Sequence, residues 1–293
     1  MTHARAWYAL LTAALLSLPD AARAQLTQAV HPQNAPLDST PAESSTASYW
    51  AGARARTFVS ATLELGLSYV RIQLASGYGR PHHDWYGLEG YTGVSSGSLA
   101  QYLGLRRVLP WASLRGGVRY QAAFERSLLP IQDHYTRRDL DTPLGDPWQY
   151  FVLEGEASAT ARLPFGQLTA LLSGHYFTLV PERDAYIFEE SLKVVAAQPW
   201  IWRARGSYAQ AFGRDDGARV GIAAEAILVP ERGSLVLRAG PTASVAVTDN
   251  LEVVATFMPV LSSPDSLGLL GADFGQLGIR LRYATGEGEQ PRR

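Results

Sequence analysis

A period of two in the residues from Trp148 to Phe177 limits most strongly what this chain can fold into. From Trp148 to Leu163 polar and apolar residues alternate, and the alternation resumes after Pro164-Phe165-Gly166. This period gives a β-strand one polar and one apolar face. Both runs exceed the usual five or six residues of a strand and are about long enough to cross a bilayer at a tilt. The stretch therefore predicts a transmembrane β-hairpin.

The first 24 residues predict a cleaved secretory signal peptide. His3 and Arg5 precede the apolar run Ala6 to Leu18, and Ala22-Arg23-Ala24 has the small-x-small pattern of a cleavage site. A membrane anchor is the alternative, but the apolar run falls short of the roughly 20 residues that a spanning helix needs. Because no later apolar run is longer, a mature chain that crosses a membrane should do so as a closed barrel.

Residues 25–48 are rich in Gln, Pro, Ser, Thr and Ala and lack apolar periodicity, which predicts a flexible periplasmic linker. A short peptide that docks a periplasmic partner is the alternative. Basic and acidic residues are nearly balanced, 26 against 27, so nothing favours a nucleic-acid partner. The chain has no cysteine, which excludes disulfides and thiolate metal sites.

Further alternating runs predict the remaining wall of a barrel over residues 49–284, followed by a polar tail, 285–293. The predicted strands outside the hairpin are Thr57–Val70, Trp85–Val94, Leu99–Val108, Ala112–Phe124, Trp200–Phe212, Val220–Leu228, Leu235–Ala239, Leu251–Phe257 and Gln276–Tyr283. Residues 77–84, 126–147 and 262–275 are predicted to be loops.

The number of strands is predicted to be about twelve, with ten to fourteen open. The segment from Glu182 to Val195 fits either a short helix or a poor strand. Counting a strand near Leu192 gives twelve but places long connections on the periplasmic side. Replacing it with a strand at Tyr49 to Ala55 also gives twelve and repairs most of that problem. We prefer the second count.

Tryptophans lie at or near the ends of predicted strands, which is the placement of an aromatic girdle at the two membrane surfaces. A soluble β-sandwich would place these rings in mid-strand. The predicted girdle consists of Trp85, Trp111, Trp148, Trp200 and Trp202, with Trp50 also near a strand end.

In its leader, alternating strands, girdle and terminal aromatic strand, the chain resembles bacterial outer-membrane β-barrel proteins from about Thr57 to Ala284. The resemblance implies an all-β, antiparallel, up-and-down barrel in contact with outer-membrane lipid. It also implies that Tyr283 belongs to an assembly signal, although ten further residues follow it. The resemblance is to this class and does not extend to a single protein.

The polar faces of the predicted strands carry charges that should point into the barrel. They are Glu64, Arg115, Arg119, Glu154, Glu156, Arg162, Arg203, Arg205, Arg219, Glu225, Arg238, Glu252, Arg280 and Arg282. Arg115 and Arg119 should oppose Glu154 and Glu156, and Glu64 should meet Arg280 or Arg282. These pairs could brace a plugged barrel, or the excess of arginine could favour anions in a narrow channel.

Two other groups raise chemical hypotheses. Ser173 and His175 share one face of a strand, as a hydrolase nucleophile and base would, but parity turns them inward and a plain polar lumen residue is the alternative. His82-His83-Asp84 has metal-ligand residue types without a third cluster, which favours a solvated loop.

The sequence thus predicts an outer-membrane β-barrel and no metal or cofactor. A narrow, anion-favouring channel is the first functional hypothesis. A structural barrel within a larger envelope assembly is the second, and a lipid hydrolase using Ser173 and His175 is the third. A lumen packed shut by Arg/Glu pairs would favour the second. The oligomeric state stays open.

Overall fold

The computed structural model describes residues 50–66, 69–141, 147–163, 166–178, 185–212, 217–273 and 278–285. The predicted leader, the linker and nearly all of the polar tail lie outside these residues. No helix within the described part of the chain is long and apolar enough to span a bilayer.

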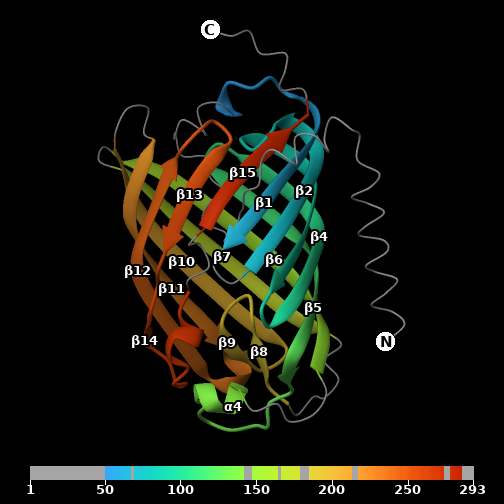
Figure 1. Ribbon diagram of the computed structural model, residues 1–293, viewed down its shortest axis with the longest axis vertical. Coiled ribbons are helices and arrows are strands. Elements are labelled where there is room, and N and C mark those ends of the chain that lie inside the picture. The colour runs from blue at the N-terminus through green and yellow to red at the C-terminus, as the bar shows by residue number, and fades with distance from the viewer. Residues whose placement is uncertain are drawn as a thin grey trace. The chain divides into compact units, whose positions relative to one another are not determined.

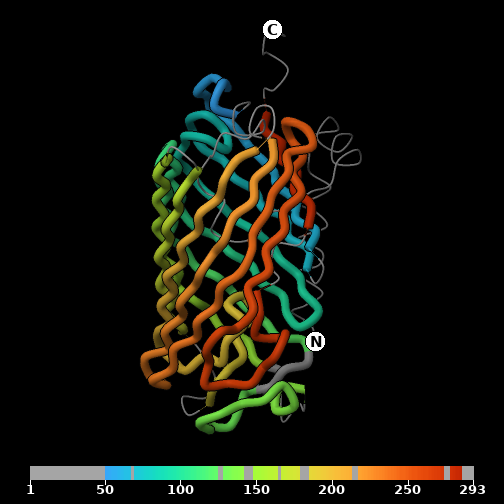
Figure 2. Tube along the Cα trace, turned by 90° about the vertical axis from the view of Figure 1, so that its left-hand side faces the viewer, coloured from blue at the N-terminus to red at the C-terminus, as the bar shows by residue number. Residues whose placement is uncertain are grey.

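Twelve antiparallel strands close into a barrel (Figures 1 and 2). The wall strands, in order around the barrel, are β1 (Arg56–Gly66), β2 (Tyr69–Arg80), β3 (Asp84–Ser95), β4 (Ser98–Leu109), β5 (Ala112–Ser127), β6 (Pro147–Leu163), β7 (Gly166–Thr178), β10 (Trp200–Phe212), β11 (Ala218–Val229), β12 (Ser234–Ala246), β13 (Leu251–Thr256) and β15 (Gly278–Ala284). Seven residue pairs between β1 and β15 complete the closure. The predicted all-β barrel of about twelve strands is confirmed.

The smaller elements lie at one end of the barrel or inside it. They are helix α4 (Arg137–Asp141), strands β8 (Ile187–Glu189), β9 (Val194–Ala196) and β14 (Val260–Ser262), and the 3₁₀ turns Pro230–Arg232 and Gly268–Gly271. Strand β14 extends the edge of β12 beyond β13. Figure 1 shows α4, β8 and β9 at the end opposite the start of β1.

The preferred strand count was right in number but wrong in one member. Trp50 and Ala51 form a helical turn, so no strand occupies the described part of residues 49–55. The twelfth strand is β2, whose first two residues were assigned to the preceding strand and whose last four were assigned to a loop beginning at Gly77. Its outward residues Val70, Ile72 and Leu74 do alternate with inward ones. The alternation of the sequence continues past Gly66, so the end of β1 at this residue was missed.

The ambiguous segment near Leu192 is not a wall strand. Strands β8 and β9 pair only with each other over three residues, and leaving them out of the wall was correct. With β2 restored, the long connections after β5, β7 and β13 share one barrel end, and tight turns such as 81–83 and 110–111 share the other. Outer-membrane barrels have short periplasmic turns and long extracellular loops, so we take the end where β1 begins as periplasmic.

The wall alternates as the sequence predicts. In β1, Ser60, Thr62 and Glu64 are buried on the inner face while Val59 on the outer face is half exposed. In β7, Leu168 and Leu172 are exposed while Ser173 is buried. A closed ring of strands with apolar side chains outside and polar ones inside satisfies its backbone without water, which is what a bilayer demands.

The girdle prediction is wrong for two tryptophans. Trp85 and Trp148 are buried on inner faces, because parity along their strands decides direction even near a strand end. Trp50, in the helical turn before β1, is also buried. Trp111, Trp200 and Trp202 are exposed, and the last two stack with ring centroids 5.3 Å apart.

The outer face predicts a depth-dependent penalty for charge. Leu172 is exposed at the middle of β7, and Leu163 is exposed at the periplasmic end of β6. We expect Leu172→Arg to lower the free energy of unfolding in vesicles by about 2–4 kcal/mol and Leu163→Arg by about 0–1 kcal/mol. Denaturant titration of vesicle-inserted protein measures both. Equal losses at the two depths would contradict a lipid-facing wall.

Candidate functional site: the barrel interior

The charged residues that the alternation predicted to point inward do lie on the inner face of the wall, and two of them lie at its periplasmic edge. Arg162 is exposed and Arg219 is only partly buried, because both lie near the periplasmic ends of their strands. The others are buried or nearly so: Glu64, Arg115, Arg119, Glu154, Glu156, Arg203, Arg205, Glu225, Arg238, Glu252, Arg280 and Arg282.

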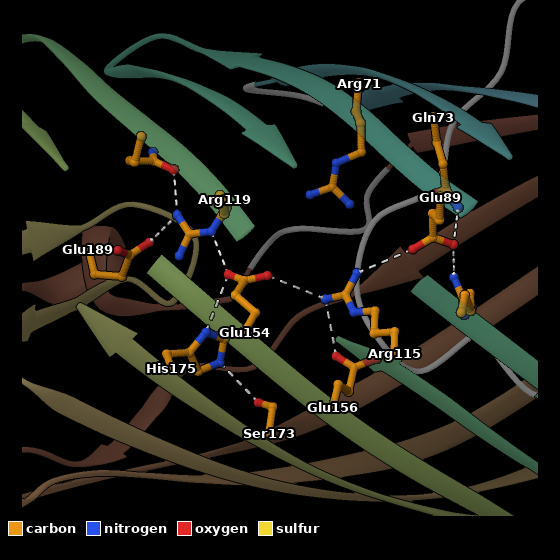
Figure 3. A network of polar contacts seen from close by, with 12 residues as sticks. Arg71, Gln73, Glu89, Arg115, Arg119, Glu154, Glu156, Ser173, His175 and Glu189 are labelled. Atoms are coloured by element: carbon orange, nitrogen blue, oxygen red, sulfur yellow. Dashed lines mark hydrogen bonds and ion pairs between the residues drawn. The ribbon is translucent and has the colours of Figure 1, made fainter. Parts of the chain in front are cut away.

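One network joins β5 and β6 (Figure 3). Arg115 Nη2 lies 3.2 Å from Glu156 Oε2, and Arg119 Nε donates to Glu154. The strand register sets Arg115 directly opposite Glu156. The structure also brings in Glu89 of β3, which accepts from Arg106 and lies 3.8 Å from Arg115.

A second network converges on Glu225 of β11. Arg203 of β10 and Arg238 of β12 donate to its two carboxylate oxygens, the latter at 2.9 Å. Arg205 lies 3.7 Å from the same carboxylate and donates to Asp273 at 3.0 Å. All three arginines are buried, and Glu225 together with Asp273 offsets two of their three positive charges.

The expected partner of Glu64 is only partly right. Glu64 and Arg280 are opposite in register where β1 meets β15, but Arg280 donates to Glu252 at 2.9 Å and Arg282 lies 3.4 Å from the same acid. Glu64 instead has Arg71 of β2 at 3.4 Å. Since β2 was not predicted, Arg71 could not be proposed as its partner.

The β8–β9 hairpin is folded into the lumen and is tied to the wall on two sides. Glu189 accepts from Arg119 at 3.1 Å and from the hydroxyl of Tyr150. Across the lumen, Arg238 donates to the backbone carbonyls of Leu192 and Lys193 at 2.8 and 2.9 Å. The hairpin therefore bridges β5 and β6 to β12.

Apolar side chains near the extracellular end form a collar around the hairpin. The collar consists of Trp148, Tyr150, Val152, Phe177, Ile201, Ile227, Val229 and Val236. Ile187, Leu192, Val194, Ala196 and Ala197 of the hairpin segment pack against it. The inward turn of Trp148 belongs to this packing and explains why it is missing from the girdle.

The outer side of the hairpin is covered by the extracellular loops. Phe188 and Val195 pack with Tyr135, Leu140 and Leu267 in a second buried cluster. Arg232 binds Asp265 through two nitrogens and lies over the ring of Tyr135 with its Cζ 4.9 Å from the centroid. Burial raises the pKa of Tyr135 to about 12. These contacts form a cap outside the hairpin.

Ser173 and His175 do come together, and with an acid. Ser173 Oγ lies 3.0 Å from His175 Nε2, and His175 Nδ1 lies 3.4 Å from Glu154 Oε1. Register explains the geometry, since His175 is directly opposite Glu154 and Ser173 is opposite Glu156. All three side chains are buried (Figure 3). Residue spacing revealed the Ser-His pair, but the acid required knowledge of the register.

The periplasmic end has its own contact around His82. The ring of Trp50 meets His82 edge-on at 4.6 Å, Arg80 donates to the carbonyl of Ala51 at 3.0 Å, and His82 Nε2 lies 3.4 Å from the carbonyl of Tyr283. Burial, with a smaller effect of Arg282, lowers the pKa of His82 from 6.5 to about 3. The predicted loop at 77–84 is thus largely strand with a tight turn at 81–83.

Within the described residues no group of three or more His, Asp or Glu is arranged to hold a metal ion. His82 instead contacts Trp50, and Asp84 lies 3.2 Å from Arg107 and 3.5 Å from Arg80.

Several interior residues were missed by sequence reasoning: Arg71, Glu89, Arg106, Glu189 and Asp273. Glu89 and Arg106 lie on the inner faces of β3 and β4, where parity alone would have found them. Glu189 and Asp273 lie outside the wall strands, so no period in the sequence marks them.

No protein-family profile and no curated protein matches the chain. Among solved structures, it is similar to a KdgM porin at 9% identity, over 78% of this chain and 96% of that one, with a TM-score of 0.38. It is also similar to a loop-deletion mutant of OmpT, an outer membrane protein of Vibrio cholerae, at 6% identity, over 78% and 97% of the two chains, with a TM-score of 0.31. Similarities this low say nothing about activity.

The closed antiparallel wall, its apolar exterior and its charged interior define the class of this protein as an outer-membrane β-barrel. Its particular function does not follow from the class, because function depends on the interior and the loops.

The convergence of three arginines on Glu225 predicts a large loss of stability when this acid is neutralised. Removing one partner of a buried ion pair typically costs about 3–5 kcal/mol, and we expect Glu225→Gln to lower the free energy of unfolding by about that amount. Glu156→Gln is the control, because Arg115 keeps Glu89 and Glu154 within 4.0 Å. Denaturant titration compares the two, and an equal or larger loss for Glu156→Gln would contradict the assignment.

His82 predicts a pH-dependent contact at the periplasmic end. The pKa of His82 is lower when the ring contacts Trp50 than when it is exposed to water, so the exposed state binds the proton more readily. The contact is therefore strongest above pH 6.5 and weakens as the pH falls toward 3. A spin label on Ala51→Cys, unique because the chain lacks cysteine, should gain mobility between pH 7.5 and 4.5. In a His82→Gln background the mobility should not change over this range. A wild-type label that is equally immobile at both values would refute the prediction.

Proposed function

We propose that this protein is a closed outer-membrane barrel that serves as the membrane component of an envelope assembly, and that it is not a standing channel. The observation that carries the proposal is the internal hairpin, which fills the lumen inside the collar and is covered by the extracellular cap. Of the three functional hypotheses from the sequence, a lumen packed shut favours the structural barrel within a larger envelope assembly.

Burial of the inner charges supports a closed lumen. A water-filled channel would leave the head groups on its wall accessible to solvent, yet the side chains of Glu64, Arg119 and Glu189 are 0% exposed and that of Arg280 is 1% exposed. Salt-linked guanidinium and carboxylate groups occupy the space instead. Removing such groups from water is costly unless each has a partner inside the protein.

The hairpin is too well packed to open by thermal motion alone. Ile187, Phe188, Leu192, Val194 and Val195 are all nearly inaccessible to solvent, and burying a large apolar side chain is worth about 1.5–3 kcal/mol. Removing them together would cost on the order of 10 kcal/mol. A spontaneously gated pore therefore fits the packing poorly.

The anion-favouring channel remains the second candidate, because Arg203, Arg205 and Arg238 gather on one side of the lumen. Its main support, the excess of arginine, is smaller than the sequence predicted. The interior gains the three acids Glu89, Glu189 and Asp273 but only the two arginines Arg71 and Arg106, and Arg162 and Arg219 lie at the periplasmic edge. A proposed periplasmic partner would bind residues 25–48.

Planar-bilayer recording tests this proposal. We expect the wild-type barrel to give no steady conductance, because the hairpin and cap close its extracellular half. Replacing residues 187–196 with a Gly/Ser linker of equal length should produce conductance steps. Replacing the turn 247–250, between β12 and β13, with Gly and Ser should not. A wild-type protein that conducts steadily and prefers anions would favour the channel.

A further inference from the structure

We propose that Ser173, His175 and Glu154 form a latent serine-hydrolase site for esters with an apolar acyl chain, covered in this state by the β8–β9 hairpin. This inference is independent of the proposed function, since a closed barrel can hold such a site with or without an assembly partner. It rests on the geometry of the three side chains and on the apolar collar and hairpin next to them.

The three residues have the relations that acyl transfer needs. When its proton is on Nδ1, which faces Glu154 Oε1 at the ion-pair distance of 3.4 Å, His175 can accept the proton of the Ser173 hydroxyl at Nε2, 3.0 Å away. Glu154 in turn accepts from Arg119 and has Arg115 Nη2 4.0 Å away. A nucleophile, a base and an acid that orients the base define the hydrolase arrangement on unrelated folds.

A positive group is available for the developing oxyanion. Arg203 is directly opposite Ser173 in the β7–β10 register, and its guanidinium is buried on the same inner face against Glu225. To stabilise the negative charge of a tetrahedral intermediate, the Arg203 guanidinium would turn from Glu225 toward Ser173. On the other side of Ser173, the register places Glu156, which is held by Arg115.

The chemistry balances without any cofactor. The Ser173 oxygen bonds to the ester carbonyl carbon while His175 takes the hydroxyl proton. The bond to the alcohol then breaks, and the alcohol leaves with that proton. Water, deprotonated by His175, attacks the acyl-serine, releases the carboxylic acid and restores the serine hydroxyl.

The neighbouring collar indicates the substrate class. Phe177 follows His175 by two residues on the same inner face, and Val152 precedes Glu154 in the same way, so the triad lies at the inner edge of the apolar collar. The hairpin now fills this collar, with Glu189 tied to Arg119 beside Glu154. An acyl chain that replaced the hairpin would exchange one apolar occupant for another and bring its ester to Ser173.

A fluorophosphonate probe tests the proposal on the full mature chain in detergent, with mass spectrometry of the adduct. Ile187→Asp with Val194→Asp should expel the hairpin and increase the labelling rate of Ser173 by at least about tenfold. Glu189→Gln, which leaves the apolar contacts intact, should increase it less. Ser173→Ala should abolish the adduct, and Ser113→Ala, at another buried inner serine, should leave it unchanged.

Substrate chain length gives the second readout. The released variant should hydrolyse p-nitrophenyl octanoate with a kcat/KM at least about tenfold above that for the acetate ester, because only the longer chain fills the collar. His175→Gln and Glu154→Gln should reduce both rates. Heat-modifiable gel mobility shows which variants are folded. If neither folded hairpin variant carries an adduct on Ser173, the triad is a structural polar cluster and the proposal is wrong.

Discussion

Closure of the hydrogen-bond ladder is the constraint on which this structure depends. In a bilayer no water satisfies a free strand edge, so the wall must return to its first strand. Here the return is made by short strands, β13 and β15, and β15 pairs with β1 over seven residues. Once the ring is closed, the period of two fixes direction: every second side chain faces lipid and the others must share the interior.

A narrow interior explains the Arg/Glu networks. Twelve inner faces bring many polar side chains into a small volume, and a charge that is withdrawn from water must find a partner there. Adjacent strands supply partners at fixed register, as between Arg115 and Glu156 or Arg203 and Glu225. The loops supply the rest, as Glu189 and Asp273 do. The hairpin is thus held by the same electrostatics that hold the wall.

The wall could be predicted from sequence because a period of two is a local property. The inner positions of Glu64, Arg119 and Glu225 followed from parity alone. What sequence could not provide were features set by contacts between distant residues. The boundary between β1 and β2 was missed because the alternation of polar and apolar residues continues past Gly66, where β1 ends. The burial of Trp148 depends on a hairpin some forty residues away, and the Glu154–His175 contact depends on register.

The internal hairpin and the loops that cover it distinguish this barrel from an open one, and the sequence of the hairpin shows no period of two. The residues around Leu192 gave an ambiguous pattern because they form neither a wall strand nor a surface helix; their apolar side chains face the collar on one side and the loop cap on the other. Two buried faces on three-residue strands erase any alternation. This packing fills the extracellular half of the barrel interior, so the stretch with the weakest sequence pattern would control access to the interior in both proposals.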